Sequence, residues 1–151
     1  MDQATITIND DDVLIRRIPP STDKFASVTD RGNGQMRATS PMMATRDDEH
    51  ALSCSLRRET SPAQLLEDLR KDNIDPAGWH VCRFTVKDVH DLKLSIASDP
   101  TERDPGHCVI SGENGIPFPS NAARKLAKRT VILTEDELRP PNVQDKPPAP
   151  A

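Results

Sequence analysis

Residues 78–110 read GWHVCRFTVKDVHDLKLSIASDPTERDPGHCVI, and this stretch decides the expected fold. It holds the single Trp of the chain, three of its four His and two of its three Cys. Residues 80–86 (HVCRFTV) alternate in polarity, which is typical of a strand with one buried face. Because Cys82 and Phe84 belong to the more apolar set, we expect both side chains to face the core.

Shorter patterns on either side of this strand predict the remaining elements. Apolar and β-branched runs predict further strands at residues 13–18, 51–56, 94–97, 107–110 and 131–133. Helical spacing of apolar residues predicts amphipathic helices from residue 62 to the stop at 73–76 and over 121–129, with a single turn at 87–92. The chain is therefore expected to be an α+β protein, with a small mixed or antiparallel sheet of four to six short strands and two amphipathic helices.

Capping residues mark the starts of the two longer helices. Ser61 can cap a helix that has Pro62 at its first position, and Gln64 is placed to complete a capping box. Ser120 is expected to cap the helix over 121–129.

The ends of the chain and one internal segment lack these patterns. Residues 1–12 are polar, with an edge strand expected at 5–8 (TITI). Residues 13–138 are expected to form a single α+β domain, in which 19–50 is a long loop rich in Gly, Ser, Thr and Asp. Residues 139–151 (RPPNVQDKPPAPA) are Pro-rich and are expected to be a disordered tail.

Composition excludes several classes of protein. The net charge of −4 argues against a generally basic nucleic-acid-binding protein. The sequence has no apolar run of membrane-spanning length, and its acidic start is unlike a signal peptide, so we expect a cytoplasmic protein. Three Cys, an odd number, favour reduced buried thiols over a disulfide framework.

Two short motifs carry a resemblance. Residues 16–20 read RRIPP, and residues 104–108 read DPGHC. Across residues 13–133 the chain resembles a loose group of short bacterial and phage-borne proteins with an RRIPP-like start and a DPGH-like segment. The resemblance implies a single compact domain and carries over no catalytic residue.

His107 is the first candidate for chemistry. It follows a glycine at the entrance of an expected strand, where an imidazole can act as acid, base or metal ligand near neutral pH. The alternative is a structural His beside the turn of residues 104–106. The sequence favours the structural role, because it shows no partner for this side chain.

A metal site is the second candidate. His80 and Cys82 share one face of their expected strand, whereas His107 and Cys108 point to opposite faces of theirs. The spacings that identify zinc sites are absent, so we expect buried thiols and no metal or other cofactor.

The third candidate is an NAD site like that of ADP-ribosyltransferases, which use an early Arg or His, a later Ser or Tyr and a Glu. Arg17 from the pair Arg16-Arg17, with Ser53 or Ser55, imitates the first two parts. Glu113 lacks the second acidic or amide residue that usually accompanies the catalytic Glu. The alternative is that these arginines make structural contacts.

Clusters of charge complete the candidates. The helix over 121–129 has one basic face, and acidic residues gather at 10–12 and 47–49. The basic face consists of Arg124, Lys125, Lys128 and Arg129. We expect it to be solvated, since the chain is acidic overall and no aromatic residues alternate with the basic ones.

Two classes of function stay open. One is a non-enzymatic binding or accessory protein that acts through contacts with another protein. The other is a small nucleotide- or NAD-using enzyme with Arg17, Ser53 or Ser55, and His107 at its site. The binding protein is favoured, because the sequence assembles no complete catalytic constellation.

Overall fold

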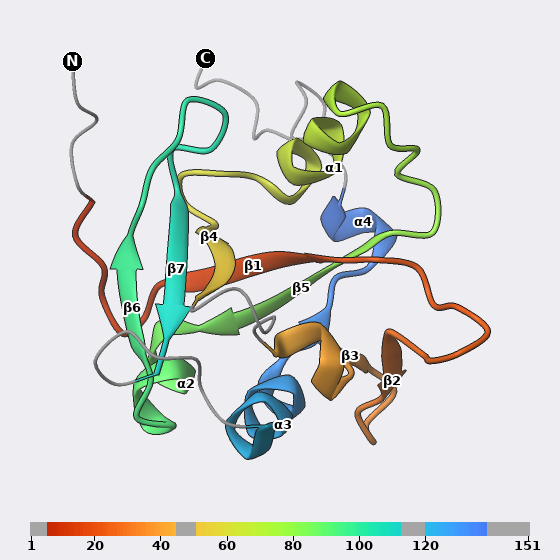
Figure 1. Ribbon diagram of the computed structural model, residues 1–151, viewed down its shortest axis with the longest axis horizontal. Helices are drawn as coiled ribbons and strands as arrows, with labels where there is room; N and C mark the ends of the chain where they lie inside the picture. The colour runs from red at the N-terminus through yellow and green to blue at the C-terminus, as the bar shows by residue number, and fades with distance from the viewer. Residues whose placement is uncertain (1–5, 45–50, 113–119, 139–151) are drawn as a thin grey trace, which may run out of the picture.

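The computed structural model describes residues 6–44, 51–112 and 120–138. Its main sheet has six strands in the order β6-β7-β4-β1-β5-β8, and every neighbouring pair is antiparallel (Figure 1). The strands are β1 (Val13–Ile18), β4 (Leu52–Leu56), β5 (His80–Thr85), β6 (Ser95–Ser98), β7 (His107–Ser111) and β8 (Val131–Ile132). The other elements are the hairpin β2 (Val28–Asp30) and β3 (Met36–Ala38), the 3-10 helix η1 (Ser40–Met43), and helices α1 (Pro62–Lys71), α2 (Val86–Asp91), α3 (Ser120–Arg129) and α4 (Glu135–Leu138). The predicted α+β class is confirmed.

Helices cover the two faces of the sheet unequally. On one face α1 and α4 pack over a small cluster that includes Ile15, Leu65 and Val81 (Figure 1). The other face carries the larger core, to which η1, α2 and α3 contribute. Successive residues of β1 serve opposite sides, since Leu14 belongs to the larger core and Ile15 to the smaller.

The strand predicted at 80–86 lies inside the sheet. β5 pairs with β1 along its whole length, and Leu14 lies opposite Phe84. Cys82 and Phe84 are both buried in the larger core, as their alternation predicted.

The start of α1 was predicted in part. The Ser61 hydroxyl accepts a hydrogen bond of 3.1 Å from the Gln64 backbone N–H, as expected of the cap. The Gln64 side chain does not reach back, so the predicted capping box is wrong; its amide donates instead to the Asp68 carboxylate at 2.9 Å. A complete box forms at α2, where Thr85 and Asp88 each accept from the other's backbone N–H.

The segment expected as one long loop contains regular structure. Within 19–50 the strands β2 and β3 form a hairpin, and η1 follows. Its turn depends on Gly32 and Gly34, whose φ angles of 103° and 82° are strained for other residues. Asp30 closes the turn by accepting from the Gly32 N–H at 2.6 Å. The hairpin places Arg31 on a short, defined turn.

The N-terminal segment binds the sheet without becoming a strand. In the described part of the expected edge strand, the Ile6 N–H donates to the Ser98 hydroxyl at 3.2 Å, and Ile6 and Ile8 pack against the larger core. No ladder forms there, so the prediction of a strand is wrong for residues 6–8. Thr5, the tail at 139–151, the acidic residues at 47–49, Glu113 and the Ser120 side chain lie outside what is described. None of the described helices is long and apolar enough to cross a membrane.

Candidate functional site

Ser55 and His107 are brought together, but they do not bond to each other. They lie directly opposite in the pairing of β4 with β7. The Ser55 hydroxyl donates to Asp104 Oδ2 at 2.5 Å, while His107 Nδ1 lies 2.8 Å from the Asp99 carbonyl oxygen. Ser55 is also buried. This pair therefore lacks the hydrogen bond by which a His activates a Ser nucleophile.

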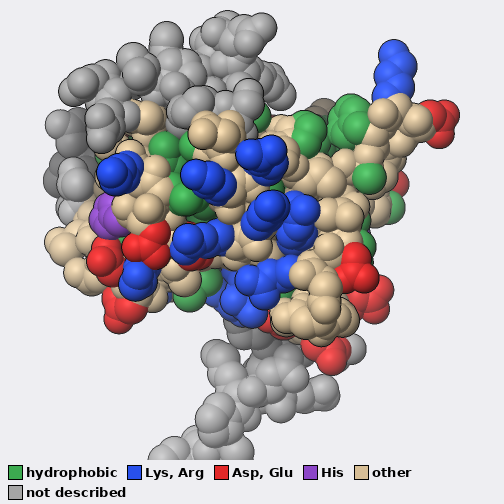
Figure 2. All heavy atoms as spheres, turned by 90° about the horizontal axis from the view of Figure 1, so that it is seen from below, with side chains coloured by type: hydrophobic (Ala, Val, Ile, Leu, Met, Phe, Trp, Pro, Cys, Tyr) green, Lys and Arg blue, Asp and Glu red, His purple; other side chains and the backbone are tan. Residues whose placement is uncertain are grey.

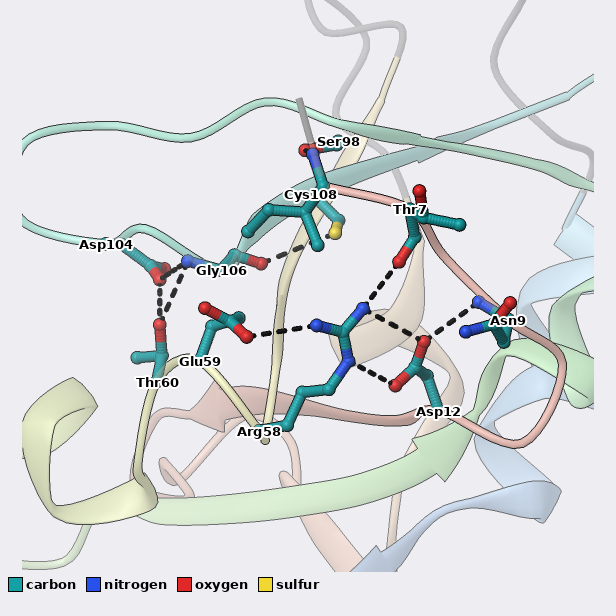
Figure 3. Close-up of polar contacts among 11 residues, drawn as sticks. Thr7, Asn9, Asp12, Arg58, Glu59, Thr60, Ser98, Asp104, Gly106 and Cys108 are labelled. Carbon is teal, nitrogen blue, oxygen red and sulfur yellow. Dashed lines mark hydrogen bonds and ion pairs between the residues drawn. The ribbon is translucent and has the colours of Figure 1, made fainter. Parts of the chain in front are cut away.

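The DPGH segment forms a buried polar lock around Asp104 (Figure 3). Asp104 is 8% exposed and accepts from the hydroxyls of Ser55 and Thr60 and, at 3.1 Å, from the Gly106 N–H. A Cβ on Gly106 would lie 2.9 Å from the Leu56 carbonyl oxygen, so the approach requires glycine. Every polar atom of this lock has a partner, which indicates a structural role.

A second polar cluster ties the N-terminal segment to the turn after β4 (Figure 3). Arg58 Nε donates to Asp12 Oδ1 at 2.7 Å, and a second guanidinium nitrogen donates to the Thr7 carbonyl oxygen at 2.5 Å. Asp12 also accepts from the Asn9 N–H at 2.8 Å. The hydrogen bond from Arg58 lowers the pKa of Asp12 below its ordinary value of 3.8, against the opposing effect of burial.

The two arginines of the alternative NAD site make structural contacts. Arg17 donates to the Leu65 carbonyl oxygen at 3.2 Å, which ties β1 to α1. Arg16 donates to the Ser53 carbonyl oxygen at 2.7 Å and to the Met42 carbonyl oxygen at 3.1 Å. Both arginines thus make the structural contacts that were the alternative to cofactor binding.

The His and Cys residues are spread across the sheet. Two strands, β4 and β1, separate His107 and Cys108 on β7 from His80 and Cys82 on β5. Cys108 lies opposite Cys54. Within the described ranges no three His, Cys, Asp or Glu side chains gather closely enough to hold a metal ion.

Burial sets the chemistry of the thiols. It raises the pKa of Cys82 to about 12 and that of Cys108 to about 11, and it raises the pKa of Cys54 well above its ordinary value. All three are free and buried thiols, as the odd count predicted. Protonated at neutral pH, they are poor nucleophiles and poor metal ligands.

Basic side chains gather on the face formed by α3 and the neighbouring hairpin (Figure 2). On α3 the buried positions Ala122, Ala123, Leu126 and Ala127 alternate with exposed basic positions. Arg31 from the hairpin turn adds to the basic positions of the helix. Arg83 of β5 lines the adjoining hollow, although Ile15, opposite it in the sheet, belongs to the small cluster on the other face. We call the resulting set the basic surface; it consists of Arg31, Arg83, Arg124, Lys125, Lys128 and Arg129.

Part of the basic surface lines a hollow of about 660 Å³, which we call the basic hollow. Its charged lining consists of five cations and one anion: Arg31, Arg83, Lys125, Lys128, Arg129 and Asp88. Another hollow, of about 620 Å³ beside α1, has a different character, because its charged residues include Glu67 and Arg70, which pair with each other at 3.0 Å. Of these two hollows, the basic hollow is the one with an excess of positive charge.

The cations of the basic surface differ in whether a nearby carboxylate neutralises their charge. Arg129 pairs with Asp88 at 3.1 Å and with Asp91 at 3.3 Å. Among the described residues, the one side-chain partner of the Arg31 guanidinium is the neutral Gln35 side chain, at 3.5 Å. Within the described part of the chain, four cations have no hydrogen bond or ion pair: Arg83, Arg124, Lys125 and Lys128. Their charge is available to a ligand.

Sequence reasoning found only the helical part of this surface. Arg83 was visible as a polar residue in an alternating strand, but nothing local links β5 to α3. Arg31 lay in a segment expected to be a loop.

No protein-family model, no curated protein and no solved structure matches the chain. The resemblance in the RRIPP and DPGH segments therefore stays an expectation.

Proposed function

We propose that this is a non-enzymatic binding protein whose basic surface docks on an acidic segment of a partner protein. The observation that carries the proposal is the separation of charge: five cations line one hollow of a chain whose net charge is −4. Complementary charge steers a partner to such a face and selects against partners of the wrong sign. Four cations of the basic surface have no partner within the described residues, so a ligand need not displace an existing ion pair.

A short acidic segment suits the basic surface better than a nucleic acid does. Asp88 and Asp91 pair with Arg129 and interrupt the positive charge at one end of the basic surface, so the surface offers a short binding site and not a long track for a phosphate backbone. Among the described residues that line the basic hollow, the one aromatic is Phe84, which is 2% exposed and cannot stack on a base.

The enzyme alternative has less support. A catalytic role for Ser55 would require its hydroxyl to leave Asp104, and a role for Arg17 would require it to leave the Leu65 carbonyl. A thermal-shift measurement with NAD tests this alternative directly, because a ligand of the folded state raises the melting temperature. A rise that Arg17→Ala abolishes would favour the enzyme.

Chemical-shift mapping on the isotopically labelled full chain tests the binding proposal. We expect a glutamate peptide of about twelve residues to shift the amides of α3, Arg31 and Arg83, and to lose its effect as salt screens the charges. Shifts spread over both faces of the sheet would contradict the proposal. A DNA duplex is the second probe; if it binds the same residues more tightly than the peptide, the partner is a nucleic acid instead.

A further inference from the structure

The cations of the basic hollow come from three separate parts of the fold. Arg31 comes from the turn of the β2–β3 hairpin, and Arg83 comes from β5. Lys125 and Lys128 come from successive turns of α3. The positive charge that lines the hollow is therefore assembled from three segments of the chain rather than from one.

This arrangement suits one chemical group better than the others. A carboxylate has two oxygens in one plane and is satisfied by a single guanidinium fork. A phosphate monoester has three acceptor oxygens that point in different directions, and it carries a charge between about −1.5 and −2 at neutral pH. Two arginines supply planar forks and two lysines supply compact charges, a combination common at phosphate sites.

We propose that the basic hollow is a phosphate site, and that it binds a phosphoserine or phosphothreonine within the acidic segment of the partner. This inference rests on the proposed function, because it names the group that anchors that segment. In this proposal the phosphate group lies in the basic hollow. Arg124 is exposed and lies outside the hollow, where it contacts the acidic residues that flank the phosphorylated residue of the partner. Phosphorylation of the partner then controls binding.

One carboxylate in the lining offsets part of the positive charge of the hollow. Asp88 lines the hollow and holds Arg129 at 3.1 Å, which reduces the positive charge at that end. Arg83 and the two lysines have no such partner within the described residues. A phosphate is therefore expected to lie toward Arg31, Arg83 and the lysines, away from α2.

Calorimetric titration with three peptides tests the inference. The peptides share a glutamate-rich sequence of about nine residues and differ only at the centre, which is Ser, Glu or phosphoserine. We expect the full-length protein to bind the phosphoserine peptide about tenfold more tightly than the Glu peptide at about 150 mM salt. This advantage should fall below about pH 6, where the phosphate gains a proton.

Two variants assign the effect to the hollow. Arg83→Gln, or Lys125→Gln if the first variant does not fold, should remove most of the preference for phosphoserine over Glu. Arg124→Gln is the matched control, since it lies on the basic surface but outside the hollow, and it should weaken both peptides alike. Equal affinity of the native protein for the phosphoserine and Glu peptides would overturn the phosphate site and leave the proposed function standing. No binding of any peptide would overturn both.

Discussion

Asp104 accepts a hydrogen bond of 2.5 Å from the hydroxyl of Ser55, a residue 49 positions earlier in the chain. Thr60, beside the start of α1, donates to the other carboxylate oxygen. One buried carboxylate thus joins β4, the entry to α1 and the loop before β7. The sequence singled out His107 in the DPGH segment, but the hydrogen bonds of this segment converge on Asp104.

Replacing Asp104 with Ala should be among the most destabilising polar substitutions in the chain. The change leaves the hydroxyls of Ser55 and Thr60 without their acceptor and removes one of the two acceptors of the Gly106 N–H. Such losses at a charged group cost about 2–4 kcal/mol in the free energy of unfolding. Urea denaturation measures the loss. Glu102→Ala is the matched control, since Glu102 is exposed on the same loop, and it should cost less than about 0.5 kcal/mol. Equal stability of the two variants would show that the lock is unimportant.

Arg58→Ala should make the protein less stable at neutral pH, and the deficit should shrink in acid. Arg58 lowers the pKa of Asp12 in the folded protein, so the ionised carboxylate contributes stability above its unfolded pKa of about 3.8. That contribution is lost as the pH falls through the lower, folded pKa. Urea midpoints at neutral pH and near pH 3 measure the change.

Arg57→Ala is the control for this pair, because the Arg57 side chain has no ion pair within the described residues. It should show no such dependence on pH. A constant deficit for Arg58→Ala across the whole range would mean that the contact with Asp12 is not electrostatic.

The three thiols should react only when the protein opens. Cys54, Cys82 and Cys108 are buried, and burial raises the pKa of each. A thiol reagent at mildly alkaline pH should therefore label the native protein slowly and the urea-unfolded protein at once. Rapid labelling of one thiol in the native state would reveal an opening of the sheet near that residue.

The sequence predicted those parts of the fold that depend on local pattern. Alternation in 80–86 was enough to bury Cys82 and Phe84, because a strand inside a sheet has one consistent apolar face. Ser61 and Pro62 marked the start of α1 for equally local reasons. The hairpin was missed although its turn contains two glycines, because its strands are only three residues long and lack an apolar run.

The candidate site could not be predicted, because it depends on contacts between distant segments. Arg31, Arg83 and Lys125 have no relation in sequence, and only the packed fold places them around one hollow. Contacts with residues elsewhere in the fold also explain why Ser55 and His107 do not form a catalytic pair. His107 and Ser55 do lie opposite each other, but the distant Asp104 and the nearby Asp99 occupy their polar atoms.

The affinity of a glutamate peptide for charge-reversed variants tests the account most directly. Lys125→Glu/Lys128→Glu alters the basic surface, and Arg70→Glu/Lys71→Glu makes the same change in net charge on α1, across the sheet. Calorimetry at moderate salt measures both variants against the native chain, once circular dichroism has shown that each is folded. The account predicts at least about a tenfold loss of affinity for the α3 variant and near-native affinity for the α1 variant. Equal affinities of the native protein and the two variants would contradict it.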